Sequence, residues 1–432
     1  MVVPPDGPID ERLNEEYARA LDAADPLRAY RDRFLIPRGP DGQEALYLCG
    51  HSLGLQPREA REAVLQELSD WAELGVDAHF RGRRPWYSYH EVLRESGARL
   101  VGAKPHEVVW MNGLTVNLHL MLATFYRPTA QRYKIVIEDC AFPSDLYAVR
   151  TQLRWHGFDP ADGLIVLRPR PGEHALRIED VEAALERDGP AIALVLLPGV
   201  NYFTGQVFDL ARITVAAHRQ GAVAGFDLAH AAGNVALGLH DRDADFAVWC
   251  SYKYLNSGPG AAAGCFVHER HARNTGLPRF GGWWGNDPKV RFRMHLEPEF
   301  VPVPTADAWQ LSNPPILSMA PLVASLALFD EAGMPALRAK SRALTGYLRR
   351  LVESQVGRRV EIITPSEPDA CGCQLSMLLD ADLKKVQQAL AAEGVVCDTR
   401  EPNVLRAAPV PLYNTFHEVW RFVRVLAAVL HE

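Results

Sequence analysis

The sequence has no apolar run long enough to cross a membrane. Its longest apolar stretches, such as Ala191–Leu197, are far shorter than the roughly 20 residues that a spanning helix needs. Its first residues, MVVPPDGPIDERLNEE, lack the basic start and the apolar core of a secretion signal. These absences predict a cytoplasmic protein with no membrane partner.

A disulfide framework and a basic patch are also missing. The seven cysteines are scattered, and their odd number indicates reduced thiols rather than a set of pairs. The net charge is −7, and Lys and Arg are not clustered along the chain. Because nucleic-acid binding relies on clustered positive charge, we expect no nucleic-acid partner.

The chain does contain enough apolar sequence for more than one core. It has 432 residues, 48% of them hydrophobic, whereas single cores rarely grow beyond about 250–300 residues. From Glu107 onward, short apolar segments alternate with helical stretches, which predicts an α/β fold with a mainly parallel sheet and flanking helices. The expected strands are Val108–Met111, Lys134–Glu138, Leu164–Leu167, Ala193–Leu197, Ala222–Asp227, Phe246–Cys250 and Gly264–His268.

The two ends of the chain have a different pattern. We expect an amphipathic helix over Pro57–Leu74 and one long helical stretch from Pro314 to Val356. A smaller α+β segment follows, with strands expected at 360–364, 373–378 and 394–398. The predicted organisation is an N-terminal segment (1–77) that contributes to a small domain, a large domain (78–320) and a C-terminal α+β domain (321–432).

Three motifs follow predicted strands, where open α/β sheets bind their ligands. Asn112-Gly113-Leu114-Thr115 opens the helix expected over Val116–Phe125, and its N–H groups and hydroxyl suit a phosphate. Asp227 ends a strand, where a carboxylate pairs with a protonated ring nitrogen or merely caps the next helix. Lys253 follows another strand and is either a nucleophile or an ordinary loop residue.

The order of these motifs is more specific than any one of them. A phosphate turn comes first, then an acid at a strand end, and 26 residues later a lysine after the next strand. Enzymes that use pyridoxal 5'-phosphate need a Schiff-base lysine, an acid for the pyridinium and a cup for the phosphate. We therefore predict pyridoxal 5'-phosphate as the cofactor.

Longer motifs occur in order from about residue 46 to residue 430. They are YLCGHSLGLQP (47–57), RRPW (83–86), MNGLTVNLHLML (111–122), AFPSD (141–145), TGQ (204–206), FDLAHAAGN (226–234), SYKYLN (251–256) with GPG (258–260), GWWG (282–285), LSNPP (311–315) and LRAAPVPLYN (405–414). In these motifs the chain resembles kynureninases, a family on the fold-type I, aminotransferase class V-like scaffold. The resemblance implies a large pyridoxal-phosphate domain, a small domain and a homodimer with active sites at its interface.

The resemblance also implies roles for individual residues. Lys253 matches the Schiff-base lysine that moves the α-proton, and Asp227 matches the acid on the pyridine nitrogen. Arg406 matches the arginine that clamps the substrate α-carboxylate, a task suited to a planar fork of donors. The other matches are His230 beside Asp227, Phe142 stacked on the cofactor ring, Asp145 at the side of that ring, Leu114, Thr115 and Tyr252 at the phosphate, Ser52 near the substrate, and Trp283 and Asn313 reaching across the dimer interface.

The implied reaction is hydrolysis of L-kynurenine or 3-hydroxy-L-kynurenine to anthranilate or 3-hydroxyanthranilate plus L-alanine, in tryptophan degradation and NAD biosynthesis. Water adds to the side-chain ketone, and the Cβ–Cγ bond breaks in a retro-Claisen step. Tyr252, with a phosphate oxygen of the cofactor, is the candidate acid/base for the hydration. His79 and Asn313 match positions at the substrate ring, and their polarity favours the 3-hydroxy substrate while still admitting the other.

Two positions depart from the family pattern and leave alternatives open. His51 stands where Asn is expected, which leaves the contact of Ser52 undecided, and Cys371 stands where the family usually has Arg. Cysteine desulfurases use the same fold with a nucleophilic cysteine downstream of the lysine, but Cys373 begins an apolar strand, an inert setting for a thiol. A non-catalytic binding protein is the other alternative, although such a protein is expected to lose the lysine, the acid or the arginine.

Overall fold

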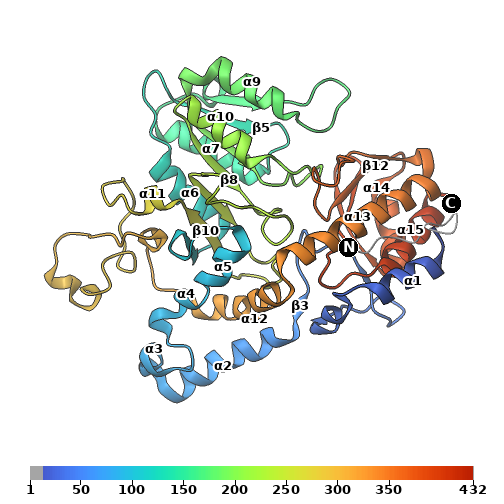
Figure 1. Cartoon of the computed structure of the whole chain (residues 1–432), viewed down its shortest axis with the longest axis horizontal. Helices are drawn as coiled ribbons and strands as arrows, with labels where there is room; N and C mark the ends of the chain where they lie inside the picture. The colour runs from blue at the N-terminus through green and yellow to red at the C-terminus, as the bar shows by residue number, and fades with distance from the viewer. Residues whose placement is uncertain (1–12, 432) are drawn as a thin grey trace.

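The computed structural model describes residues 13–431 and arranges them in a large lobe and a smaller one (Figure 1). Most of the N-terminal stretch in which no secretion signal is expected lies outside the described residues. Within residues 13–431 no single helix is both long and apolar enough to span a membrane, and one pair of helices reaches that composition only together, across an 82° bend.

A seven-stranded sheet forms the centre of the large lobe, in the order β4-β10-β9-β8-β7-β5-β6. Of these seven strands, β10 alone runs opposite to the other six, so the prediction of a mainly parallel sheet is confirmed. All seven expected strands are present, and each end lies within one residue of its predicted position. Their bounds are β4 Val108–Met111, β5 Lys134–Glu138, β6 Leu164–Leu167, β7 Ile192–Pro198, β8 Val223–Asp227, β9 Phe246–Trp249 and β10 Ala263–Val267.

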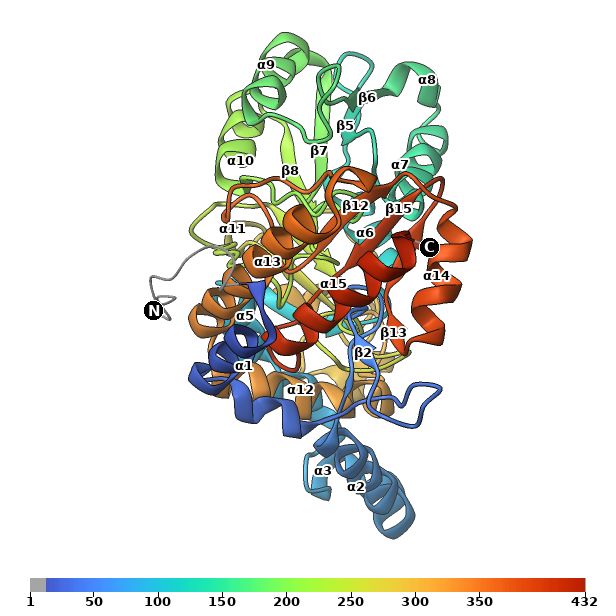
Figure 2. The ribbon, with the colours of Figure 1, turned by 90° about the vertical axis from the view of Figure 1, so that its right-hand side faces the viewer.

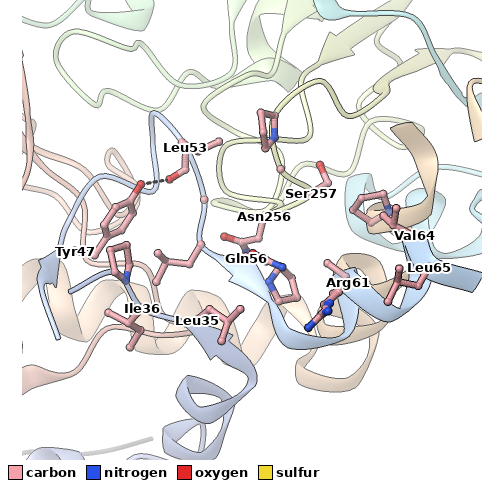
Figure 3. Close-up of a pocket in the computed structure, with 18 residues that line it drawn as sticks. Leu35, Ile36, Tyr47, Leu53, Gln56, Arg61, Val64, Leu65, Asn256 and Ser257 are labelled. Carbon is pink, nitrogen blue, oxygen red and sulfur yellow. Dashed lines mark hydrogen bonds between the residues drawn. The ribbon is translucent and has the colours of Figure 1, made fainter. Parts of the chain in front are cut away.

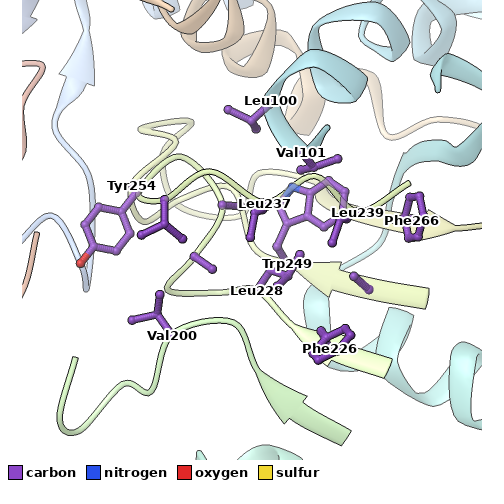
Figure 4. Packing of buried hydrophobic residues seen from close by; sticks show 14 of the residues in the cluster. Leu100, Val101, Val200, Phe226, Leu228, Leu237, Leu239, Trp249, Tyr254 and Phe266 are labelled. Carbon is purple, nitrogen blue, oxygen red and sulfur yellow. The ribbon is translucent and has the colours of Figure 1, made fainter. Parts of the chain in front are cut away.

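Helices cover both faces of this sheet, which is why its strands are apolar on both sides. On one face, α6 (Leu114–Phe125) and α7 (Pro143–Trp155) share a core with the strands. On the other, the strands pack with α5 (Arg94–Val101), α9 (Ile178–Asp188), α10 (Leu210–Arg219) and α12 (Ile316–Ala332). Figure 4 shows the core on this other face of the sheet, where Phe226 and Trp249 project from neighbouring strands. The helix expected from Val116 begins two residues earlier, at Leu114.

The long helical stretch expected from Pro314 to Val356 is two helices, so that prediction was wrong. α12 ends at Ala332, and α13 (Met334–Gln355) leaves it at 82°. Gly333 between them has φ +73°, a left-handed conformation that ends helices and favours glycine. The bend carries the chain from the large lobe into the smaller one (Figure 1).

The smaller lobe is built from both ends of the chain (Figure 2). Its four-stranded sheet has the order β11-β12-β15-β14, and β2 pairs in parallel with β13. Helices α1, α13, α14 and α15 share a second core with these strands. The strand expected over 394–398 is two short strands, β13 and β14. The bounds are α1 Glu15–Ala24, β2 Leu46–Tyr47, β11 Val360–Ile362, β12 Leu375–Leu379, α14 Leu383–Ala392, β13 Val395–Val396, β14 Asp398–Arg400, β15 Val404–Ala407 and α15 Phe416–His431.

Along the chain, three helices connect the N-terminal strands to the large sheet. The first, α2 (Arg58–Leu74), packs on α12, and the short helices α3 (Ala78–Arg81) and α4 (Tyr89–Val92) follow it. The predicted helix over Pro57–Leu74 is thus present, beginning at Arg58. A two-stranded sheet of β1 (Phe34–Leu35) and β3 (Gln56–Pro57) precedes it. Two further short helices, α8 (Pro160–Gly163) and α11 (Glu269–Ala272), complete the large lobe. The domain boundaries after residues 77 and 320 stay predictions.

Candidate active site

The carboxyl ends of the central strands meet the start of α6 at one pocket. β5 ends at Glu138, β7 at Pro198 and β8 at Asp227, and the loop after β9 carries Lys253. Parallel strands present their carboxyl ends at the same edge of the sheet, so residues far apart in sequence converge there. The lining includes the predicted cofactor residues Leu114, Thr115, Phe142, Asp145, Asp227, His230, Tyr252 and Lys253.

Lys253 is held by a histidine beside an aromatic ring. Its Nζ lies 3.1 Å from Nε2 of His230 and 5.6 Å from the centre of the Phe142 ring. Burial, together with the charges of Lys253 and Arg406, keeps the pKa of His230 well below its usual value. The imidazole is therefore neutral and accepts a hydrogen bond from the lysine. This arrangement suits a lysine that reacts with a carbonyl carbon.

Three buried carboxyl groups share this pocket. Asp227 accepts a hydrogen bond from the amide of Ala229 at 2.6 Å and another from Asp145. Burial and the neighbouring Asp227 raise the pKa of Asp145 well above its usual value, so Asp145 holds the shared proton. Burial, with Asp227 nearby, also raises the pKa of Glu138 to about 8. The pocket thus concentrates acids that lack sufficient positive charge around them.

The turn between β4 and α6 has the form that a phosphate site needs. Asn112 has φ +48°, which turns the chain sharply before Gly113, and within residues 13–431 no side chain caps the first N–H groups of α6. Unpaired N–H groups at a helix start attract an anion. The hydroxyl of Thr115 lies 3.0 Å from that of Ser144, at the start of α7, and both line the pocket.

These residues fit pyridoxal phosphate. Oδ1 of Asp145 has no hydrogen-bond partner among the described residues, and the three acids face a single lysine. A protonated ring nitrogen adds the missing positive charge, and a phosphate satisfies the start of α6. Asp227 would hold the ring nitrogen, and Leu114 and Thr115 the phosphate. The bound cofactor supplies an electron sink for negative charge at the substrate Cα.

Arg406 lies beside this pocket, on β15 of the smaller lobe. It is fully buried, its Nη1 donates to the carbonyl of Tyr202 at 2.6 Å, and its Nη2 pairs with Asp398. Its guanidinium carbon is 5.8 Å from the centre of the Tyr202 ring, and that ring lines the pocket. Arg400 donates to the second oxygen of Asp398 at 2.6 Å. A buried arginine needs an anion, and Asp398 supplies one that the sequence did not reveal.

Besides Arg406, four predicted site residues are not among those that line the pocket. Ser52 lies in the turn after β2, and the ring of His79 on α3 packs 5.3 Å from that of Trp86. Trp283 packs against Trp284 with ring centres 4.8 Å apart, and Asn313 is exposed. Among the described residues no hydrogen bond or ion pair joins any of these four to Lys253, and their roles stay predictions.

Sequence reasoning missed Glu138, Tyr202 and Asp398. Glu138 ends an apolar strand just as Asp227 does, so its position was a usable signal. Tyr202 lies two residues before the TGQ motif, which draws attention to the segment but not to this side chain. Asp398 carries no local signal, because its role depends on pairing with Arg406 on the neighbouring strand as well as with Arg400 on its own strand.

The two cysteines that suggested a desulfurase are in an inert setting. Cys371 is 6% exposed and Cys373 is fully buried. Burial raises the pKa of both thiols, that of Cys373 to about 11. Since the thiolate is the nucleophile, neither cysteine is prepared for attack.

Known relatives of the chain agree on one family. The model of the kynureninase C-terminal domain matches residues 337–426. The kynureninase of Koribacter versatilis (strain Ellin345) is 56% identical over 417 residues, which cover 96% of this chain and 98% of the relative. That of Myxococcus xanthus (strain DK1622) is 56% identical over 413 residues, covering 96% of each chain. That of Xanthomonas campestris pv. campestris (strain B100) is 54% identical and covers 95% of this chain and 97% of its own length.

Solved structures share the fold at much lower identity. A C-DES variant with glycine covalently linked to its PLP cofactor has a TM-score of 0.76 at 19% identity, covering 92% of this chain and 98% of its own. The cysteine desulfurase CsdA of Escherichia coli has a TM-score of 0.75 at 19% identity, covering 94% and 98%. Likeness at this identity shows the fold alone, and it confirms the predicted fold-type I scaffold. The family follows instead from identity above one half along nearly the whole chain: this protein belongs to the kynureninase family.

Proposed function

We propose that this protein hydrolyses L-kynurenine and 3-hydroxy-L-kynurenine to L-alanine and the matching anthranilate, with pyridoxal phosphate held by Lys253. The observation that carries the proposal is the convergence of Lys253, Asp227 and the uncapped start of α6 at one pocket, with Arg406 beside it. The lysine, the acid and the arginine that a non-catalytic relative is expected to lose are all in place.

Each residue has a task that its surroundings support. Arg406 binds the α-carboxylate of the substrate, and Lys253 moves the proton at Cα. Burial and the neighbouring Cys250 raise the pKa of Tyr252, so its phenol stays protonated and is able to donate to the side-chain ketone oxygen when water adds. Phe142, 43% exposed at the pocket, offers an apolar face to a planar ring.

We infer that the active unit is a homodimer. An apolar groove of about 700 Å³ lies between the N-terminal strands and the loop 256–259 (Figure 3). Large side chains on and near it are exposed, such as Leu35 at 42%, Leu65 at 41% and Trp71 at 60%. Contiguous exposed apolar surface is typical of an interface. The predicted roles of Trp283 and Asn313 likewise require a second chain.

The finer assignments are proposals of the same kind. We place the reaction in tryptophan degradation, with a link to NAD biosynthesis, in the cytoplasm. We also propose a preference for the 3-hydroxy substrate, because His79 and Asn313 offer polar groups to a ring hydroxyl. Replacing His79 by Trp is expected to lower the ratio of the rate on 3-hydroxykynurenine to that on kynurenine. An unchanged ratio contradicts the role of His79.

The decisive experiment follows alanine release from each substrate by the cofactor-loaded protein. Lys253→Ala is expected to abolish release of alanine and of the anthranilate. Lys104→Ala is the matched control, since Lys104 pairs with Glu269 at 2.6 Å, outside the pocket, and its loss is expected to leave the rate unchanged. A protein whose spectrum responds to L-cysteine but that releases no alanine from either kynurenine disproves the proposal.

A further inference from the structure

His51 is a fully buried histidine whose ring has no hydrogen bond to any described residue. It lies in the turn between β2 and β3 with no measurable exposure. Within residues 13–431 neither of its ring nitrogens has a hydrogen-bond partner. Leaving a buried polar group unpaired costs about 1–3 kcal/mol. Such a group therefore calls for a ligand or a water that satisfies it.

The imidazole of His51 lies between the residues around Lys253 and the residues around Arg406. Its ring centre lies 6.3 Å from that of His230, which contacts Lys253. On the other side its Nε2 lies 3.7 Å from Oδ2 of Asp398, the partner of Arg406. A ligand that reaches both Lys253 and Arg406, as an amino-acid substrate does, therefore comes close to His51.

The charges around His51 favour an anion. Two guanidinium groups, those of Arg400 and Arg406, share the single carboxylate of Asp398, which leaves one positive charge in excess. Burial and the charges of Arg406, Arg400 and Lys253 hold the pKa of His51 well below its usual value, so it is neutral. Nε of Arg406 is a second buried donor without a partner among the described residues.

A metal ion does not explain these unpaired atoms. Donor atoms of Cys49, His51 and Asp398 do lie within 4.8 Å of one another. However, burial raises the pKa of the Cys49 thiol to about 12, and both oxygens of Asp398 are taken by arginines. A cation here also meets the repulsion of two guanidinium groups.

We propose that His51, together with Arg406, hydrogen-bonds the α-carboxylate of the substrate, and that Asp398 is a positioning residue that holds the guanidinium of Arg406. The inference rests on the proposed function, because it needs an amino-acid substrate. One carboxylate neutralises the excess charge and accepts from the unpaired donors of His51 and Arg406. The histidine thus takes a role at a position where the sequence pattern led us to expect asparagine.

The test compares two ligands that differ by the carboxylate. For the holoenzyme, KM and kcat are measured with L-kynurenine, and the inhibition constant is measured with kynuramine, which lacks that group. His51→Leu is expected to raise KM by about tenfold, the effect of one lost hydrogen bond to a charged group. The inhibition constant for kynuramine is expected to stay within about twofold. His51→Asn, which keeps one donor, should fall between wild type and His51→Leu.

One control variant and one alternative variant make the outcome of this comparison unambiguous. His119→Leu removes a half-buried histidine from α6, whose ring faces Gln152, and is expected to change neither constant. If His51→Leu loses cofactor absorbance, His51→Ala replaces it in the same comparison. An unchanged KM, or an equal loss for kynuramine, overturns the proposal, because the second result is that of a packing residue. Failure of the wild-type protein to turn over L-kynurenine would instead refute the proposed function.

Discussion

Two clusters of acidic residues lie at opposite ends of the strands of the central sheet, and they differ in how well their buried acids are paired. One is the pocket at the carboxyl ends of the strands, with Glu138, Asp145 and Asp227. The other, the histidine–carboxylate cluster, lies at the start of β4 and β9 and consists of Glu107, Asp243, Asp245, Glu269, His218, His240, His268 and His271.

In the histidine–carboxylate cluster the two most buried acids have several donors each. Glu107 accepts from the amides of Lys104 and Glu269 at 2.8 and 2.7 Å, and from His240 at 3.0 Å. Asp245 accepts from the amide of Ala224 and from two histidines. Burial by itself would raise the pKa of Asp245, but hydrogen bonds from His218 and His271 lower it below the usual value.

In the pocket the pKa shifts have the opposite sign. Burial raises the pKa values of Asp145, Asp227 and Glu138, and they face a single lysine. Both clusters contain buried Asp and Glu residues beside the same sheet, so the difference in the sign of their pKa shifts comes from their hydrogen-bond partners. A cluster whose acids are paired stabilises the fold, whereas a cluster whose acids lack partners is prepared for a ligand.

The largest expected effect on turnover comes from replacing an aspartate by asparagine, a change that is made once in the pocket and once in the histidine–carboxylate cluster. Asp227→Asn should lower turnover by on the order of 10²–10³-fold, because the cofactor ring loses its charged partner. The fold should not suffer, since a buried carboxylate with a raised pKa is removed. Asp245→Asn should leave turnover per folded molecule unchanged but lower the free energy of unfolding by about 1–3 kcal/mol, because Arg270, His218 and His271 lose the buried carboxylate that they share. Alanine release and denaturant unfolding are the measurements, and equal effects in both clusters contradict the comparison.

A smaller effect is expected from Tyr252→Phe. Loss of one acid/base in the hydration step should slow turnover by about 10²-fold or more, while cofactor absorbance persists. Tyr126→Phe is a control, because that buried tyrosine donates to the carbonyl of Tyr133 away from the pocket. Unchanged turnover of Tyr252→Phe excludes the phenol from the reaction.

The effect that is smallest per unit of pH concerns the stability of the cofactor-free protein. The folded protein raises the pKa of Glu138 from 4.5 to about 8, so it binds more protons than the unfolded chain between those values. Stability is therefore lost as pH rises through this window, by at most about 1.4 kcal/mol per unit. Glu138→Gln should flatten the fall of Tm between about pH 5 and pH 8.

The exposed Glu353→Gln serves as the control, because its carboxylate is at the surface and its only described ion pair is with Arg349 at 3.9 Å. It should follow the wild-type curve. Parallel curves for wild type and Glu138→Gln would show that Glu138 titrates normally in the folded chain.

Local features of the fold were predictable from the sequence. In the large sheet the strand ends fell within one residue, because apolar runs and the Gly, Pro and Asp residues that bound them are local signals. In the smaller lobe, β11 ends two residues before its predicted end and β12 begins two residues after its predicted start. The phosphate turn and the strand-end positions of Asp227 and Lys253 were predictable for the same reason. The break at Gly333 was missed, because apolar residues continue on both sides of it and the composition resembles one long helix.

The sequence by itself determined the order of strands and helices, the residues that present a lysine, an acid and a phosphate turn at strand ends, and the family. Only the tertiary structure decided which charges meet. Arg406 and Asp398 pair across neighbouring strands, and Arg406 reaches the carbonyl of Tyr202, some 204 positions away. His51 became informative only once its burial and its unpaired nitrogens were known. The physical reason is that periodicity is a local property of the chain, whereas burial and charge pairing depend on which distant segments pack together.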